Sequence, residues 1–211
     1  MQELNAVQLI CVWALPILLA ITFHEAAHAY VAYLCGDNTA KQMGRLSINP
    51  FRHFDFIGSF IVPVSLALLS QFQFIFGWAS PVPITWSRLK NPRWDMAKVA
   101  IAGPLSNFVM ALIFWLIWKN LVVQGSSHSS LVELFFIETS RAGVLVNVFL
   151  GWLNLFPLPP LDGSRVVAAC LPKRMAYYYS QLEPYGFFIL ILLMLSGVFR
   201  LWLSIPLRWL M

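Results

Sequence analysis

The chain has 211 residues, of which 59% are hydrophobic and only 11% are charged, and its mean hydropathy is +0.72. A water-soluble domain carries about 25% charged residues, so this composition excludes an ordinary soluble protein and predicts a membrane protein. The formal net charge is +5, but no nucleic-acid-binding module is recognisable; we expect the cations to face an anionic lipid leaflet and expect no nucleic-acid partner.

Apolar stretches, each close to the ~20 residues that a spanning helix needs, dominate the chain. They cover roughly 6–35, 56–79, 97–118, 143–161 and 184–205. The segments between them (36–55, 80–96, 119–142 and 162–182) are predicted to be loops, and no repeat or soluble domain separates the stretches. We therefore expect a single integral-membrane domain over residues 1–211. The acidic start of the chain is atypical of a signal peptide, so we expect the first helix to remain in the mature protein.

The first stretch carries His24-Glu25-Ala26-Ala27-His28 near its C-terminal end. The spacing H-E-x-x-H places two imidazoles one helical turn apart on one face, where both can bind the same zinc ion. Glu25 is then placed to take a proton from metal-bound water. Soluble metalloproteases carry the same pentapeptide, but ionisable groups within a membrane segment are costly and indicate function. The motif predicts a zinc hydrolase whose site lies below one membrane surface.

Loop charges predict the orientation of the chain. Cations gather in the loops after the first stretch, before the third and after the fourth: Lys41, Arg45, Arg52, Arg88, Lys90, Arg93, Lys98, Arg165, Lys173 and Arg174. The positive-inside rule places these loops in the cytoplasm and loop 119–142 outside, so we expect a multi-pass protein of the cell (inner) membrane with its site toward the cytoplasm. Both ends of stretch 56–79 then lie inside, which favours a hairpin or re-entrant segment over the alternative of an ordinary spanning helix.

Segment 44–50 alternates apolar and polar residues, with Leu46 and Ile48 on one side. This alternation predicts a short β-hairpin near the site, to which an extended substrate could add its backbone; an ordinary cytoplasmic loop is the alternative.

A catalytic zinc keeps three protein ligands and one open position, so a third ligand has to come from elsewhere in the chain. Asp162 is favoured, because it emerges from the proline-broken segment 157–161 at the cytoplasmic end of the fourth stretch, at the depth of the histidines. It could instead be the N-cap of a helix that starts near Ser164. His53 stays an alternative ligand, whereas His128 is predicted to lie on the opposite side. The downstream glutamates, which fit less well, are Glu133, Glu138 and Glu183.

These motifs resemble those of the site-2 protease family of intramembrane zinc metalloproteases. The resemblance rests on the zinc pentapeptide, on Asn154–Gly163 and on Ala102–Asn107. Gly44–Pro50 followed by His53, together with Leu182–Gly186, is similar to the small bacterial branch without a PDZ domain. The likeness covers nearly the whole chain, and we expect no PDZ domain, CBS domain or long extracytoplasmic insert.

The resemblance implies that His24, His28 and Asp162 bind one zinc ion per chain and that Glu25 is the catalytic base. It also implies that Asn154 and Asn107 hold the substrate backbone or the developing oxyanion. The implied fold is an all-α polytopic membrane protein, in which three transmembrane helices carry the zinc site and further helices surround them. The implied partners are the lipid bilayer and a transmembrane protein substrate, and neither the substrate's identity nor the oligomeric state is specified. A noncatalytic membrane metal-binding protein or transporter is the alternative function.

Overall fold

A computed structural model of the chain describes residues 5–53, 80–124 and 130–210, together with positions 55, 61 and 65. Nearly all of stretch 56–79 lies outside the described residues, as does His128, so the choice between a hairpin and a spanning helix stays a prediction. Within the described residues the regular structure is entirely helical, which confirms the predicted all-α class.

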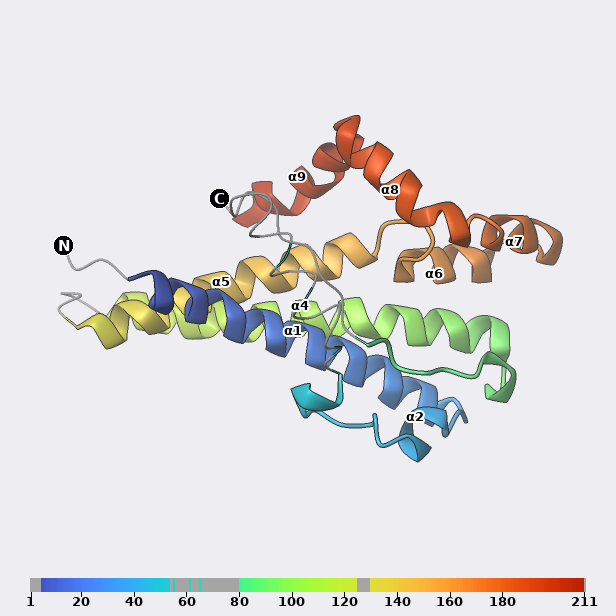
Figure 1. Cartoon of the computed structure of the whole chain (residues 1–211), viewed down its shortest axis with the longest axis horizontal. Helices are drawn as coiled ribbons and strands as arrows, with labels where there is room; N and C mark the ends of the chain where they lie inside the picture. Colours follow the sequence, from blue (N-terminus) through green and yellow to red (C-terminus); the bar gives the residue numbers. More distant parts are fainter. Residues whose placement is uncertain are drawn as a thin grey trace.

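Three long helices form the body of the molecule: α1 Ala6–Leu34, α4 Pro92–Gln124 and α5 Leu131–Asn154. They lie side by side, and each contacts the other two (Figure 1). The 29 residues of α1 give it a length of about 44 Å, which exceeds the ~30 Å hydrocarbon core of a bilayer. Its first turn is closed by a capping box between Asn5 and Gln8.

Small side chains fill the contacts between these helices, while many large apolar side chains point outward. Buried small residues of these helices include Ala20, Ala32, Ala97, Ala100, Ala111, Ala142 and Gly143. Gly143 of α5 lies so close to the Phe114 ring of α4 that a Cβ added there would overlap the ring. Lipid is as apolar as the outward side chains, so close backbone approach and van der Waals packing have to hold the helices together.

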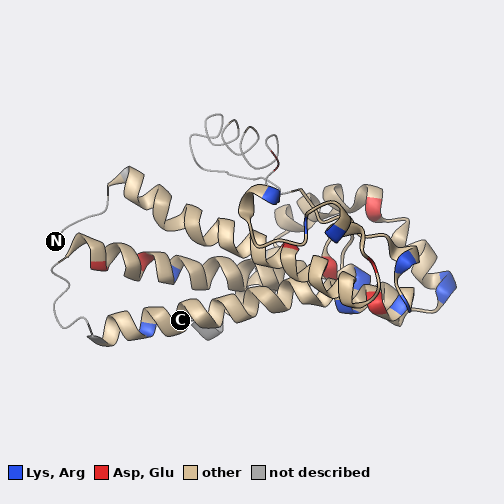
Figure 2. Cartoon of the chain, turned by 90° about the horizontal axis from the view of Figure 1, so that it is seen from below, with Lys and Arg blue, Asp and Glu red and all other residues tan. Residues whose placement is uncertain are grey.

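Four segments among the described residues are long and apolar enough to cross a membrane: Val7–Leu34, Pro92–Val123, Leu131–Asn154 and Lys173–Leu195. Figure 2 shows most Lys, Arg, Asp and Glu residues at one end of the molecule, the end at which α2 Thr39–Gln42, α6 Asp162–Cys170 and α7 Lys173–Ser180 lie in Figure 1. The long helices carry few charges toward their other end (Figure 2). The chain therefore has the character of a multi-pass membrane protein with one strongly charged end.

Short helices complete the described fold on both sides of this body. Between α1 and α4 lie α2 Thr39–Gln42, η1 Pro50–Arg52 and η3 Trp86–Arg88. After α5 come α6 Asp162–Cys170, α7 Lys173–Ser180, η4 Glu183–Tyr185, α8 Gly186–Leu195 and α9 Val198–Leu210. Helix α9 returns to α5, where the Trp152 and Trp202 rings stack with centroids 4.9 Å apart.

Several predicted boundaries were wrong. The fourth stretch was placed at 143–161, but α5 begins at Leu131, because Ser130 caps it and apolar residues follow the cap at once. The predicted loop 162–182 contains α6 and α7. The fifth stretch, 184–205, is broken between α8 and α9 at Gly197, whose φ of +78° lies in the left-handed region that glycine adopts without strain.

The predicted β-hairpin at 44–50 was also wrong, because this segment consists of turns and bends that lead into η1. Its polar groups are satisfied locally: Asn49 N donates to Ser47 Oγ at 3.1 Å, and Phe51 N donates to Asn49 Oδ1 at 3.0 Å. His53 Nε2 in turn lies 2.7 Å from the carbonyl oxygen of Ser47. Side-chain bonds of this kind offer the backbone an alternative to a strand ladder.

The contact between Gly143 and Phe114 gives a test of the packing of α4 against α5. Gly143→Ala should destabilise the protein by about 1–3 kcal/mol, because the new methyl group overlaps the Phe114 ring. The measurement is thermal unfolding in detergent. In a Phe114→Ala background, where the ring is gone, the same change should cost much less; an equal cost in both backgrounds would contradict the packing.

Candidate metal centre

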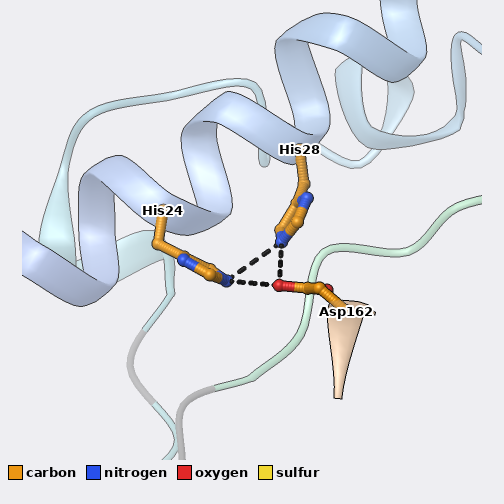
Figure 3. Close-up of side chains that lie close together, drawn as sticks. All are labelled: His24, His28 and Asp162. Carbon is orange, nitrogen blue, oxygen red and sulfur yellow. Dashed lines mark hydrogen bonds and ion pairs between the residues drawn. The ribbon is translucent and has the colours of Figure 1, made fainter. Parts of the chain in front are cut away.

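His24 and His28 of α1 meet Asp162, the first residue of α6, in the interior of the charged end (Figure 3). The two Nε2 atoms are 3.0 Å apart, and Asp162 Oδ2 lies 3.1 Å from His24 Nε2 and 3.3 Å from His28 Nε2. Both histidines are buried, and Asp162 is partly buried. Two ring nitrogens and one carboxylate oxygen thus point at a single position.

The opposite nitrogens of both rings indicate where the protons are. His28 Nδ1 lies 2.7 Å from the carbonyl oxygen of Val99, which can only accept a hydrogen bond, so Nδ1 is the donor. His24 Nδ1 lies 2.6 Å from Asn107 Oδ1, and the amide nitrogen of Asn107 is engaged elsewhere, donating to Ala20 O at 3.1 Å. In the neutral rings, the lone pairs of both Nε2 atoms therefore face inward.

Asp162 brings an anion to the same position. Burial raises the pKa of its carboxyl group, but when the His24 and His28 rings are also protonated at Nε2 their hydrogen bonds and charges outweigh burial and lower the pKa to about 2. Its Oδ2 atom is buried without a well-formed hydrogen bond. Electron-rich atoms gathered this closely repel one another unless a cation lies between them, and two histidines with a carboxylate are a donor set that suits catalytic zinc. The residues present therefore fit a zinc ion.

Close backbone approach brings the two sides of the centre together. Gly103 of α4 lies against both imidazoles, and a Cβ there would come within 2.6 Å of His24 Cε1. Gly163, the residue after Asp162, packs on the carbonyl group of Leu155 at the end of α5, where a Cβ would overlap the backbone. Any larger residue at either position would push the ligands apart.

The segment before Asp162 is held from the C-terminal side. Tyr179 Oη donates to Pro157 O at 3.0 Å, and Gly186 lies directly against the carbonyl group of Pro159. Arg165 and Glu183 form an ion pair at 2.6 Å that ties α6 to η4. These contacts hold α6 and α7, which lie in the segment that was predicted to be a loop, against the polypeptide that leads to Asp162.

Asn107 is completely buried and faces His24. Its amide nitrogen also donates to Asn147 Oδ1 of α5 at 3.1 Å, and Asn147 Nδ2 donates to Gly143 O at 2.9 Å. A hydrogen-bonded chain from α5 thereby orients the His24 ring, as outer partners commonly do in metal sites. This geometry supports an orienting role for Asn107, while the substrate contact that the resemblance implied stays a prediction. Asn147 was missed, because a lone asparagine in an apolar helix carries no motif.

Glu25 lies one residue after His24 and is half-buried. Its Oε2 accepts a hydrogen bond from the backbone N–H of Val82 at 2.8 Å. This partner was also missed, because backbone donors leave no trace in the residue type. Asn154, at the end of α5, donates from Nδ2 to Leu150 O at 3.0 Å, and its substrate contact stays a prediction.

The alternative third ligands do not join the cluster. His53 is buried, but its Nε2 is engaged by Ser47 O, as described above. Glu183 is paired with Arg165. Glu138 lies 3.9 Å from Arg141 and about 24 Å along α5 from Asn154. The group of potential metal ligands found among the described residues is His24, His28 and Asp162.

Comparisons with known proteins agree on one family. The profile of peptidase family M50 matches residues 12–140. The chain is 35% identical over 190 residues to "Putative zinc metalloprotease YwhC" of Bacillus subtilis, covering 89% of this chain and 83% of that protein. It is 25% identical over 185 residues to "Putative zinc metalloprotease Rip2" of Mycolicibacterium smegmatis, covering 88% of this chain and 67% of that protein. No solved structure matches the chain significantly.

The cluster predicts a specific pattern of metal content. The protein purified in detergent should carry about one zinc per chain, in line with one three-ligand site. Asp162→Ala should lose most of this zinc on dialysis, because only two ligands are left. His53→Ala removes a buried histidine outside the cluster and should keep the metal. Metal analysis by mass spectrometry is the measurement, and full zinc retention in Asp162→Ala would exclude this ligand set.

Proposed function

The chain belongs to peptidase family M50, and on that premise we propose that it is an intramembrane zinc endopeptidase that hydrolyses peptide bonds in or near transmembrane segments of other membrane proteins. Its family membership makes the chain a zinc metalloprotease that resides in a lipid bilayer. We further propose that residues 1–211 form one membrane protease domain and that His24, His28 and Asp162 hold one zinc ion.

The observation that carries the proposal is the convergence of His24, His28 and Asp162, with Glu25 directly after His24 on α1. Zinc bound there would polarise the scissile carbonyl group and lower the pKa of a coordinated water toward ~7. Glu25 accepts the proton of the attacking water on its carboxylate and returns it to the leaving amine. His24 and His28 keep their Nε2 lone pairs directed inward, because Asn107 Oδ1 and Val99 O accept from Nδ1.

The depth of the centre supports a membrane substrate. His24 lies within the candidate span Val7–Leu34, about 15 Å before its C-terminal end. A peptide bond in a transmembrane helix is hydrogen-bonded within that helix, so the substrate has to unwind locally before its carbonyl group can be attacked. Cleavage is therefore expected near one membrane boundary. Asn154, at the end of α5 close to the Asp162 segment, is our proposed contact for the unwound backbone.

The charge distribution supports an orientation. Most charged residues lie at the end of the molecule that contains the metal centre (Figure 2). Under the positive-inside rule, this end faces the cytoplasm, and water reaches the centre from there. The C-terminal end of α4 and the N-terminal end of α5 then lie on the outer side of the membrane.

The role of Glu25 predicts a loss of activity without a loss of metal. A library of fluorogenic single-pass transmembrane peptides in proteoliposomes provides the assay. Glu25→Gln should lower cleavage of any accepted peptide by about 100- to 10,000-fold, the usual contribution of a general base, while zinc content stays unchanged. If the wild type binds zinc but cleaves no peptide, the noncatalytic metal-binding protein or transporter becomes the better assignment.

The orientation predicts a labelling pattern. In a chain without Cys11, Cys35 and Cys170, single cysteines are placed at Lys41, in α2, and at Ser130, before α5. A membrane-impermeant maleimide should label Ser130→Cys in cells whose cell membrane is intact but whose outer layers have been permeabilised. It should label Lys41→Cys only in inverted membrane vesicles. The reverse pattern would place the metal centre on the outer side.

A further inference from the structure

An extended segment, Ser80–Thr85, runs past the Glu25 side chain. Its sequence is Ser-Pro-Val-Pro-Ile-Thr, and the two prolines have no backbone N–H to donate. Val82, between them, directs its N–H to Glu25 Oε2 at 2.8 Å. The alternation of proline with other residues thus leaves a single donor aimed at the carboxylate.

This segment is fixed at several points. Its first residue, Ser80, donates from its backbone N to His53 O at 3.0 Å. Arg45 Nη1 donates to Pro81 O at 3.0 Å. The Val82 side chain is buried in a cluster with Ala29 and Ala40. The donor therefore belongs to a held piece of backbone and not to a free loop.

Asp37 holds the far end of the segment. It is only 1% exposed, and its Oδ2 accepts from the backbone N of Thr85 at 2.6 Å. Its Oδ1 accepts from the backbone N of Thr39 at 2.9 Å, which ties the same carboxylate to α2. Burial raises the pKa of Asp37, but the donors of Thr39 and Thr85, with Arg88 nearby, lower it below its usual range and keep the group ionised.

We propose that the Val82 N–H is a positioning donor for Glu25, and that Asp37 is the buried anchor that sets its place. The proposal rests on Glu25 being the base of the proposed reaction. A glutamate on a helix has several rotatable bonds, and fixing one carboxylate oxygen presents the other in a defined direction. Such orientation can contribute strongly to a proton transfer, because small displacements of a reacting group slow it steeply. Asp37 acts on the reaction without touching the metal ligands.

The first test needs no substrate. Amide hydrogen exchange, read at single residues by mass spectrometry, is compared between the wild-type protein and Glu25→Ala in detergent. Loss of the acceptor should speed exchange at Val82 by at least about tenfold, while Ile84, whose N–H has no partner among the described residues, should keep its rate. An unchanged rate at Val82 would overturn the proposal, whatever the protein cleaves.

The second test separates positioning from folding. Val82→Pro removes the donor. Ile84→Pro places the same substitution two residues along, at an N–H that engages no acceptor in the described part of the chain. With a peptide that the wild type cleaves, kcat of Val82→Pro should fall at least about tenfold, with KM within about twofold and zinc content unchanged. Ile84→Pro should keep kcat near the wild-type value. Equal kcat values in the two variants, or a loss of zinc in Val82→Pro, would overturn the proposal.

Asp37→Asn tests the role of the anchor independently and can be used if Val82→Pro does not fold. It replaces one of the two oxygen acceptors by an amide nitrogen, so it should lower kcat, leave KM and zinc content unchanged, and speed exchange at Val82. Wild-type kcat and exchange in Asp37→Asn would contradict the role of the anchor. If the wild-type protein cleaves no peptide, that result contradicts the proposed function only. The hydrogen bond between Val82 N–H and Glu25 is tested separately, by the exchange experiment.

Discussion

The convergence of two imidazole nitrogens and a carboxylate oxygen on one buried position is the constraint on which the rest of the structure depends. These atoms are 3.0–3.3 Å apart, so their lone pairs repel one another unless a metal ion or a proton lies between them. A metal that binds the folded chain and not the unfolded one adds its binding free energy to folding. A zinc ion held by His24, His28 and Asp162 would therefore stabilise the folded chain.

Much of the surrounding architecture follows from bringing three helices within reach of that position. Gly103 allows α4 to approach the imidazoles, and Gly163 allows α6 to approach the end of α5. The side chains of Asn107 and Asn147, both completely buried, then link α5 through α4 to His24 of α1 by hydrogen bonds. Apolar packing alone could not choose one rotation of each helix in lipid, whereas these hydrogen bonds can. Small residues and buried amides therefore specify the site jointly.

The sequence was informative wherever chemistry and spacing coincide. The pentapeptide predicted two histidines on one face of α1, and the proline-broken segment predicted an acidic group at their depth; the structure places Asp162 beside them. Hydropathy predicted helix boundaries less well. It predicted one continuous apolar stretch through Gly197, where the chain breaks between two helices, and it gave no sign of α6 and α7, which are short and amphipathic. Backbone donors such as the Val82 N–H, and buried amides such as Asn147, could not be predicted, because their role depends on tertiary contacts.

The ligands come from opposite halves of the chain, since α1 supplies the histidines and α6 supplies the aspartate. A nascent chain that has inserted α1, α4 and α5 carries the motif of a protease but lacks the third ligand. Chains of this size commonly fold in stages during synthesis, so the centre is completed only after Asp162, at position 162 of 211 residues, has emerged. The order of translation itself then delays the reactive state, and a truncated product of the same gene would remain inert in the membrane.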